Sequence, residues 1–104
     1  MTEDPKFAEL RAWIGGHNEN ALLADGFEEA IIGIAERCGQ PVLVVYDAIK
    51  CIDILEKRDG MDRDEAFEFF QFNTLGSWVG DNTPLFLWRP DPELLEWTFT
   101  QSPK

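Results

Sequence analysis

A run of branched apolar residues that ends at an aspartate constrains the fold of this chain more than any other stretch. Residues 42–46 read Val-Leu-Val-Val-Tyr, and β-branched side chains favour a strand over a helix. Asp47 follows directly and is a typical helix cap, because its carboxylate accepts a backbone N–H of the first turn. The stretch over residues 41–87 is therefore predicted to begin with a buried strand that leads straight into a helix.

Two helices are predicted after this strand. The first, over about residues 48–58, has an apolar stripe at i, i+3, i+4 and i+7, formed by Ala48, Cys51, Ile52 and Leu55. The second, over about residues 63–74, begins with Asp62 as cap and Glu65 at the third helical position, which resembles a capping box. Phe72 falls on the polar side of this helix.

The remaining elements complete an α+β prediction. A helix over about residues 5–14 begins at an aspartate–proline pair. Residues 25–39 fit a helical spacing, but Gly33 and neighbouring isoleucines favour a strand, and we interpret the segment as part of a hairpin over about residues 29–46. A strand over about residues 83–88 is expected to join it. The predicted fold class is α+β, with a small antiparallel sheet packed against the three helices.

Composition indicates one folded domain over residues 1–104. The chain has the commonest domain size, and its 44% hydrophobic and 28% charged residues are usual for globular proteins. No apolar run reaches the about 20 residues that a membrane helix requires. The two cysteines, Cys38 and Cys51, are expected to be free thiols in a cytosolic protein.

The net charge limits the partners. The sequence has 20 acidic and 9 basic residues, for a formal net charge of -11, and such a field repels nucleic-acid phosphates and anionic membranes. We therefore expect no direct nucleic-acid binding and no membrane contact, and a basic protein surface as the partner. The predicted partner-binding acidic face is formed by Asp59, Asp62, Asp64, Glu65 and Glu68.

The chemistry-bearing residues form no catalytic pattern. Asp47, Lys50 and Cys51 are close in sequence, but the single histidine, His17, lies in a distant predicted loop, and a reactive thiolate needs a nearby base or positive field. The paired carboxylates are typical of helix starts and solvated faces, and no spacing matches a zinc or calcium site. We predict no catalytic residues, no metal and no cofactor.

Polar and aromatic residues give two further candidate sites. A ligand pocket between sheet and helices is predicted from Tyr46, Lys50, Asn73 and Trp78. Trp88 and Trp97 flank a proline-rich segment, and they are candidates either for core packing or, if exposed together, for aromatic anchors that bind a partner or a second copy. Trp13 and Trp78 are also able to fill the core.

Several short runs resemble small uncharacterised proteins encoded by tailed bacteriophages and prophages. They include residues 30–33, Val45-Tyr46-Asp47, Lys50-Cys51, Asp59-Gly60-Met61, Glu65-Ala66, Phe72-Asn73, Gly76, Val79-Gly80 and Thr83-Pro84. The resemblance covers about residues 27–87. It implies a phage or prophage origin and a bacterial cytoplasm, and it carries over no active residues.

The negative net charge, the lack of a catalytic pattern and the resemblance to phage proteins together favour a non-enzymatic interaction protein. In this hypothesis the acidic face binds a host protein, as an anti-defence inhibitor or nucleic-acid mimic whose carboxylates replace phosphates. One alternative is a small-molecule or nucleotide-binding module that uses the predicted pocket. Another is an oligomeric structural protein joined through its C-terminal aromatic residues.

Overall fold

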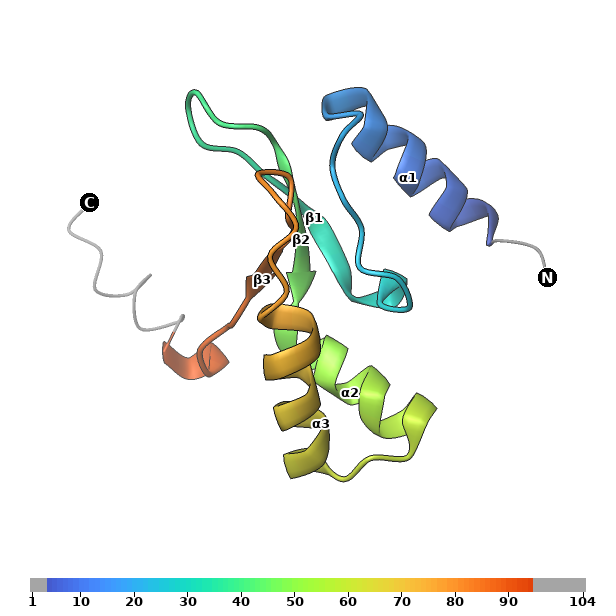
Figure 1. Ribbon diagram of the computed structural model, residues 1–104, viewed down its shortest axis with the longest axis vertical. Coiled ribbons are helices and arrows are strands. Elements are labelled where there is room, and N and C mark those ends of the chain that lie inside the picture. Colours follow the sequence, from blue (N-terminus) through green and yellow to red (C-terminus); the bar gives the residue numbers. More distant parts are fainter. Residues whose placement is uncertain (1–3, 95–104) are drawn as a thin grey trace.

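The apolar run before Asp47 forms the central strand of a mixed sheet. In the computed structural model, which describes residues 4–94, β2 (Leu43–Asp47) lies between β1 (Ile31–Ala35) and β3 (Leu85–Leu87) (Figure 1). β1 pairs antiparallel with β2, so the interpretation of residues 25–39 as part of a hairpin is confirmed. The α+β fold class is confirmed as well.

β3 runs parallel to β2, so the prediction of an antiparallel sheet is wrong for this strand. The cause is the segment over residues 76–84, which carries the chain back past the sheet before β3 begins (Figure 1). A strand that starts beside the start of its neighbour must run in the same direction. Strand propensity identifies the strand but does not encode this direction.

Aspartates cap the helices α1 (Pro5–His17), α2 (Ala48–Asp59) and α3 (Arg63–Phe70). The carboxylates of Asp4, Asp47 and Asp62 each accept a backbone N–H of the first turn, at N···O distances of 2.8, 3.1 and 2.8 Å. Each such cap stabilises its helix by roughly 1 kcal/mol. The starts of the helices are therefore encoded locally.

The helix ends differ more from the predictions. Gly60 adopts a left-handed conformation with φ 71° and ends α2 as expected. α1 continues to His17 instead of ending at residue 14. The predicted helix over residues 63–74 is divided into α3 and a π-helical turn, η2 (Gln71–Leu75). A short 3₁₀ turn, η1 (Glu28–Ala30), precedes β1.

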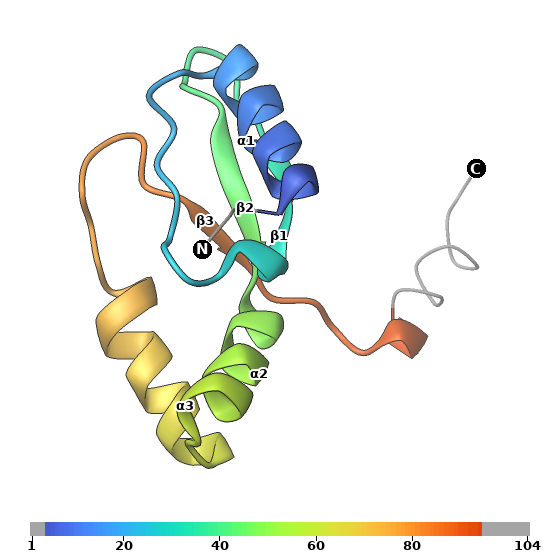
Figure 2. The same cartoon turned by 90° about the vertical axis from the view of Figure 1, so that its right-hand side faces the viewer.

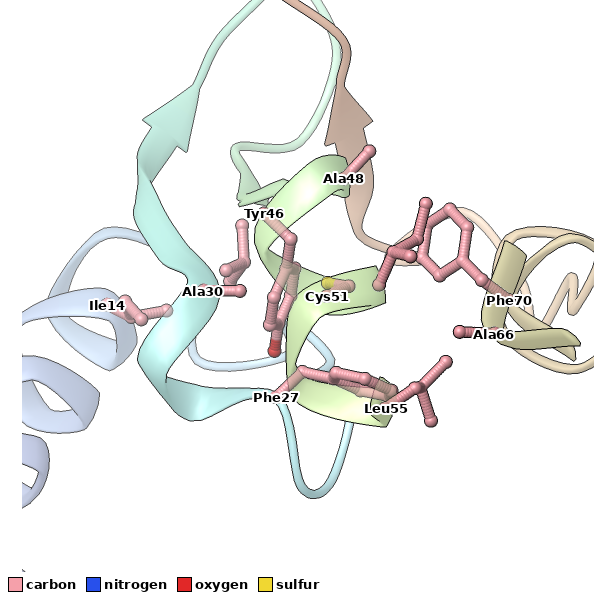
Figure 3. Packing of buried hydrophobic residues seen from close by; sticks show 11 residues of the cluster. Ile14, Phe27, Ala30, Tyr46, Ala48, Cys51, Leu55, Ala66 and Phe70 are labelled. Atoms are coloured by element: carbon pink, nitrogen blue, oxygen red, sulfur yellow. The ribbon is translucent and has the colours of Figure 1, made fainter. Parts of the chain in front are cut away.

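The buried residues form one cluster around β2 (Figure 3). Val44 and Tyr46 are fully buried on one face of the sheet, and α2 contributes the predicted stripe of Ala48, Cys51, Ile52 and Leu55. Ala66 and Phe70 approach from α3, and Ile14 joins from α1. Full burial of each large apolar side chain stabilises the fold by about 1.5–3 kcal/mol.

Tyr46 connects the sheet to segments on both sides. Its ring stacks on Phe86 of β3 with a centroid distance of 5.5 Å, and Phe86 meets Phe70 of α3 edge-on at 5.3 Å. The backbone N–H of Ala24 donates to the Tyr46 hydroxyl oxygen at 2.7 Å. Burial raises the pKa of this hydroxyl to about 12.

Trp13 and Trp78, which are able to fill the core, lie at the surface instead. Trp13 is 48% exposed on α1, where its ring packs edge-on against His17. Trp78 is 72% exposed in the segment after η2. Phe86 and Phe70, rather than an indole ring, pack beside Tyr46.

Because Tyr46 is the single tyrosine, its ionisation can be measured directly. The folded state favours the neutral phenol, because burial raises its pKa from the ordinary 10.0 to about 12. The unfolded chain therefore loses this proton first, and the free energy of unfolding falls as pH rises from 10.0 to about 12. We expect the tyrosinate absorbance of the native protein to rise only near pH 12, and that of the denatured chain about two units lower.

Replacement of Tyr46 by Phe provides the control. It removes both the titration and the acceptor of the Ala24 N–H, so at neutral pH we expect a loss of about 1 kcal/mol in urea unfolding. Its stability should also depend less steeply on alkaline pH. A native tyrosinate signal at the same pH as in the denatured chain would contradict the burial of this hydroxyl.

Candidate functional site

The predicted acidic residues extend from the end of α2 to the last turn of α3. Asp59 ends α2, Asp62 caps α3, and Asp64, Glu65 and Glu68 lie on α3; all five are exposed. Two of them have local partners. Asp62 accepts the N–H of Glu65, and the Arg58 guanidinium, which donates to both Asp59 oxygens, lowers the pKa of that carboxyl.

Arg63 directs its positive charge toward α2. Its guanidinium lies 2.6 Å from an Asp53 carboxylate oxygen and 3.4 Å from one of Glu56. These half-exposed pairs contribute little stability, but they place the one cation of α3 on the side that faces α2. The outer side of α3 is consequently acidic.

Exposed aromatic residues accompany these acids. Phe72 is 75% exposed, and Phe69 is also exposed. Residues four apart on a helix are neighbours, so Phe69 lies next to Glu65 at the flank of the buried Ala66 and Phe70. Phe72 belongs to the π-helical turn η2, which continues the chain about one turn beyond Glu68. Figure 2 shows α3 at the border of the molecule beside α2. We call Asp64, Glu65, Glu68, Phe69 and Phe72 the acidic–aromatic face.

The proposed aromatic anchors have different positions. Trp88 directly follows β3, and its ring contacts Phe67 and Phe70 of α3, each with a centroid distance of 5.9 Å. The next residue, Arg89, lies 3.5 Å from an Asp47 carboxylate oxygen. Trp88 therefore packs against the edge of the core and remains partly exposed. Trp97 lies outside the described residues.

The structure does not bring together the four residues of the predicted ligand pocket. Tyr46 is fully buried in the core, and Lys50 is exposed in the first turn of α2. The amide of Asn73 donates to the Phe69 carbonyl oxygen at 3.2 Å. Asn73 and Trp78 line two different cavities, and neither of these cavities is lined by Tyr46 or Lys50.

The larger cavity is a groove of about 660 Å³ between the β1–β2 turn and the segment that joins η2 to β3. Its apolar lining includes Leu43, Leu75, Trp78, Pro84 and Leu85. Close packing at Gly76 shapes one side, since a Cβ there would lie 2.9 Å from the Gln71 carbonyl oxygen. The sequence analysis did not predict this groove. The feature that could have indicated it is Trp78, an aromatic residue between Gly76 and Gly80 that lines the groove.

The smaller cavity, of about 250 Å³, lies between the Leu22–Phe27 region, η2 and the start of β3. Asn73, Thr74 and Ser77 give it a polar side. Phe86 and Pro84 line both this cavity and the groove. The segment before β3 therefore separates two concave surfaces.

Metal ligation and thiol chemistry were the two reactive possibilities among the described residues. No cluster of three or more His, Cys, Asp or Glu side chains between residues 4 and 94 is arranged to hold a metal ion. Burial, together with a smaller effect of the neighbouring Asp47 carboxylate, raises the pKa of the Cys51 thiol to about 12. A thiol in this state is a poor nucleophile.

The helices described by the structure lack a segment long and apolar enough to cross a membrane. Comparison with known proteins found no matching family model, no similar curated protein and no similar solved structure.

The two thiols should differ sharply in reactivity. Both are free, but Cys38 is exposed after β1 and Cys51 is buried with a raised pKa. We expect an aromatic disulfide reagent to modify one thiol per native chain, and both after unfolding. Cys38→Ser should abolish the native reaction and Cys51→Ala should leave it unchanged. Fast modification of Cys51 in the native protein would indicate an activated thiol after all.

Proposed function

We propose that this protein is a non-enzymatic binding module that engages a basic surface of a bacterial host protein through the acidic–aromatic face. The observation that carries the proposal is the 75% exposure of Phe72, which lies in the η2 turn directly after the acidic outer side of α3. Aromatic side chains supply most of the energy of many interfaces, while surrounding charges set specificity and association rate. The net charge of -11 adds long-range attraction to a basic partner.

The chemistry of the face favours competition with nucleic acid. A host surface that binds phosphates presents lysine and arginine, and the carboxylates of Asp64, Glu65 and Glu68 offer acceptors to the same side chains. In this form of the proposal the protein is an anti-defence inhibitor that occupies a nucleic-acid site. Phe69 and Phe72 add apolar contacts that a phosphate backbone does not provide.

The groove supports a second candidate function. Its volume of about 660 Å³ lies within the range of small-molecule sites. Its charged lining residues are Glu36, Arg37 and Asp81, a set that disfavours nucleotides because two of the three are acidic. An apolar ligand is the better fit, and a thermal shift with apolar probes that Trp78→Ala removes would support it.

Charge reversal tests the leading proposal. The double variant Glu65→Lys/Glu68→Lys should lose at least about tenfold in capture of its partner from a bacterial lysate at low salt, because attraction becomes repulsion. Glu9→Lys/Glu29→Lys makes the same change of charge on other exposed positions and is the matched control. Near 1 M salt, where the Debye length is about 3 Å, capture by the unmodified protein should also weaken.

Two further readouts sharpen this test. Phe72→Ala should reduce capture without lowering the urea midpoint, since the side chain is mostly exposed. Duplex DNA added to the lysate should displace the captured protein. Equal loss in both double variants would show an effect of total charge alone, and unchanged capture by the Glu65/Glu68 variant would refute the proposed face.

A further inference from the structure

β3 is an edge strand in the described part of the chain. β2 pairs with one side of it, and between residues 4 and 94 no strand pairs with the other. Phe86 packs inward on Tyr46 and Phe70, so its neighbours Leu85 and Leu87 face the other way by strand alternation. Both leucines are exposed, by 45% and 42%. Such an edge is a template for one more strand.

The groove adjoins this edge on the open face of the sheet. The register pairs Leu43 with Ala35 and Val45 with Leu85, which places these four residues on the face opposite Val44 and Tyr46. Ala35, Leu43 and Leu85 line the groove, and Trp78 forms part of its wall while 72% exposed. An apolar concavity therefore lies directly beside a free strand edge.

The charge of the protein and of the groove indicates which kind of segment binds there. A second copy of the chain would bring another net charge of -11 to the interface, and an acidic or phosphorylated segment would meet the same repulsion. The charged lining residues are two acids, Glu36 and Asp81, and one base, Arg37. A basic segment with bulky apolar side chains complements this surface.

We infer that the groove binds an extended segment of the basic partner, which pairs with the outer edge of β3 and inserts an apolar side chain against Trp78. This inference rests on the proposed function and names the partner chemistry. The smaller cavity lies on the other side of Pro84 and Phe86. Alternate side chains of an extended segment therefore meet different surfaces, a bulky one in the groove and a smaller one opposite.

Synthetic peptides test this site on the full chain by calorimetry. The probe is a short peptide in which lysine alternates with leucine, and its comparison peptide has glutamate in place of lysine. Only the basic peptide should bind. N-methylation of alternate backbone amides should weaken it at least about tenfold, because it removes the strand-pairing hydrogen bonds.

Two tryptophan variants provide the matched pair on the protein. Trp78→Ala should weaken binding of the basic peptide at least about tenfold, whereas Trp13→Ala, which removes an exposed indole on α1, should change it less than about twofold. Unchanged binding to Trp78→Ala, or equal binding of the N-methylated peptide, would overturn the inference. So would preferential binding of a peptide with the sequence of residues 95–104, or a concentration-dependent dimer that Trp78→Ala dissolves.

The lysate capture separates this inference from the proposed function. If Glu65→Lys/Glu68→Lys loses the partner and Trp78→Ala keeps it, the acidic–aromatic face stands and the groove inference fails. If Trp78→Ala loses the partner and the Glu65/Glu68 variant keeps it, the proposed face fails. Loss in both, with capture intact in Trp13→Ala, supports one partner that contacts the two surfaces together.

Discussion

The burial of Tyr46 is the interaction on which the rest of the structure depends. Its ring stacks on Phe86 of β3, and its hydroxyl accepts the Ala24 N–H from the segment before η1. Through Phe86 the same contact reaches Phe70 of α3. A single side chain of the central strand thus connects β3, the α2–α3 pair and the N-terminal region. Burial of its hydroxyl costs little free energy, because the hydroxyl is hydrogen bonded.

The asymmetry of the sheet follows from this arrangement. Val44 and Tyr46 direct one face of β2 into the core, and their partners on β1 and β3 must follow them. The other face carries Leu43, Val45, Leu85 and Leu87. These side chains are apolar and partly or largely exposed. The fold therefore buries one face through aromatic contacts and leaves the groove and the β3 edge on the other.

Local signals made much of the fold predictable. Asp47, Asp62 and Gly60 mark helix boundaries through backbone hydrogen bonds and left-handed φ, and these effects act within a few residues. The direction of β3 was not predictable, because it depends on the path of residues 76–84, and no short-range pattern encodes that path. The same limit applies to Trp78, which is apolar enough for the core but lies outside it, while Phe70 and Phe86 pack beside Tyr46.

The candidate site was predictable only in part, for a related reason. Charge and helical spacing located Glu65 and Glu68 and placed Phe72 on the polar side, since helix geometry fixes which residues are neighbours. The structure does not bring Tyr46, Lys50, Asn73 and Trp78 into one pocket, because the Tyr46 side chain is buried in the core. The groove arises from the β1–β2 turn and residues 75–86, which meet only in three dimensions.

Strong negative charge and exposed apolar surface have complementary physical roles in this protein. Exposed side chains such as Phe72, Trp78 and Leu85 favour association, and with a neutral surface they would promote contacts between copies. A net charge of -11 opposes such self-contacts while it attracts a basic protein. Under the proposed function, the same carboxylates that keep copies apart leave the apolar surface to a partner of opposite charge.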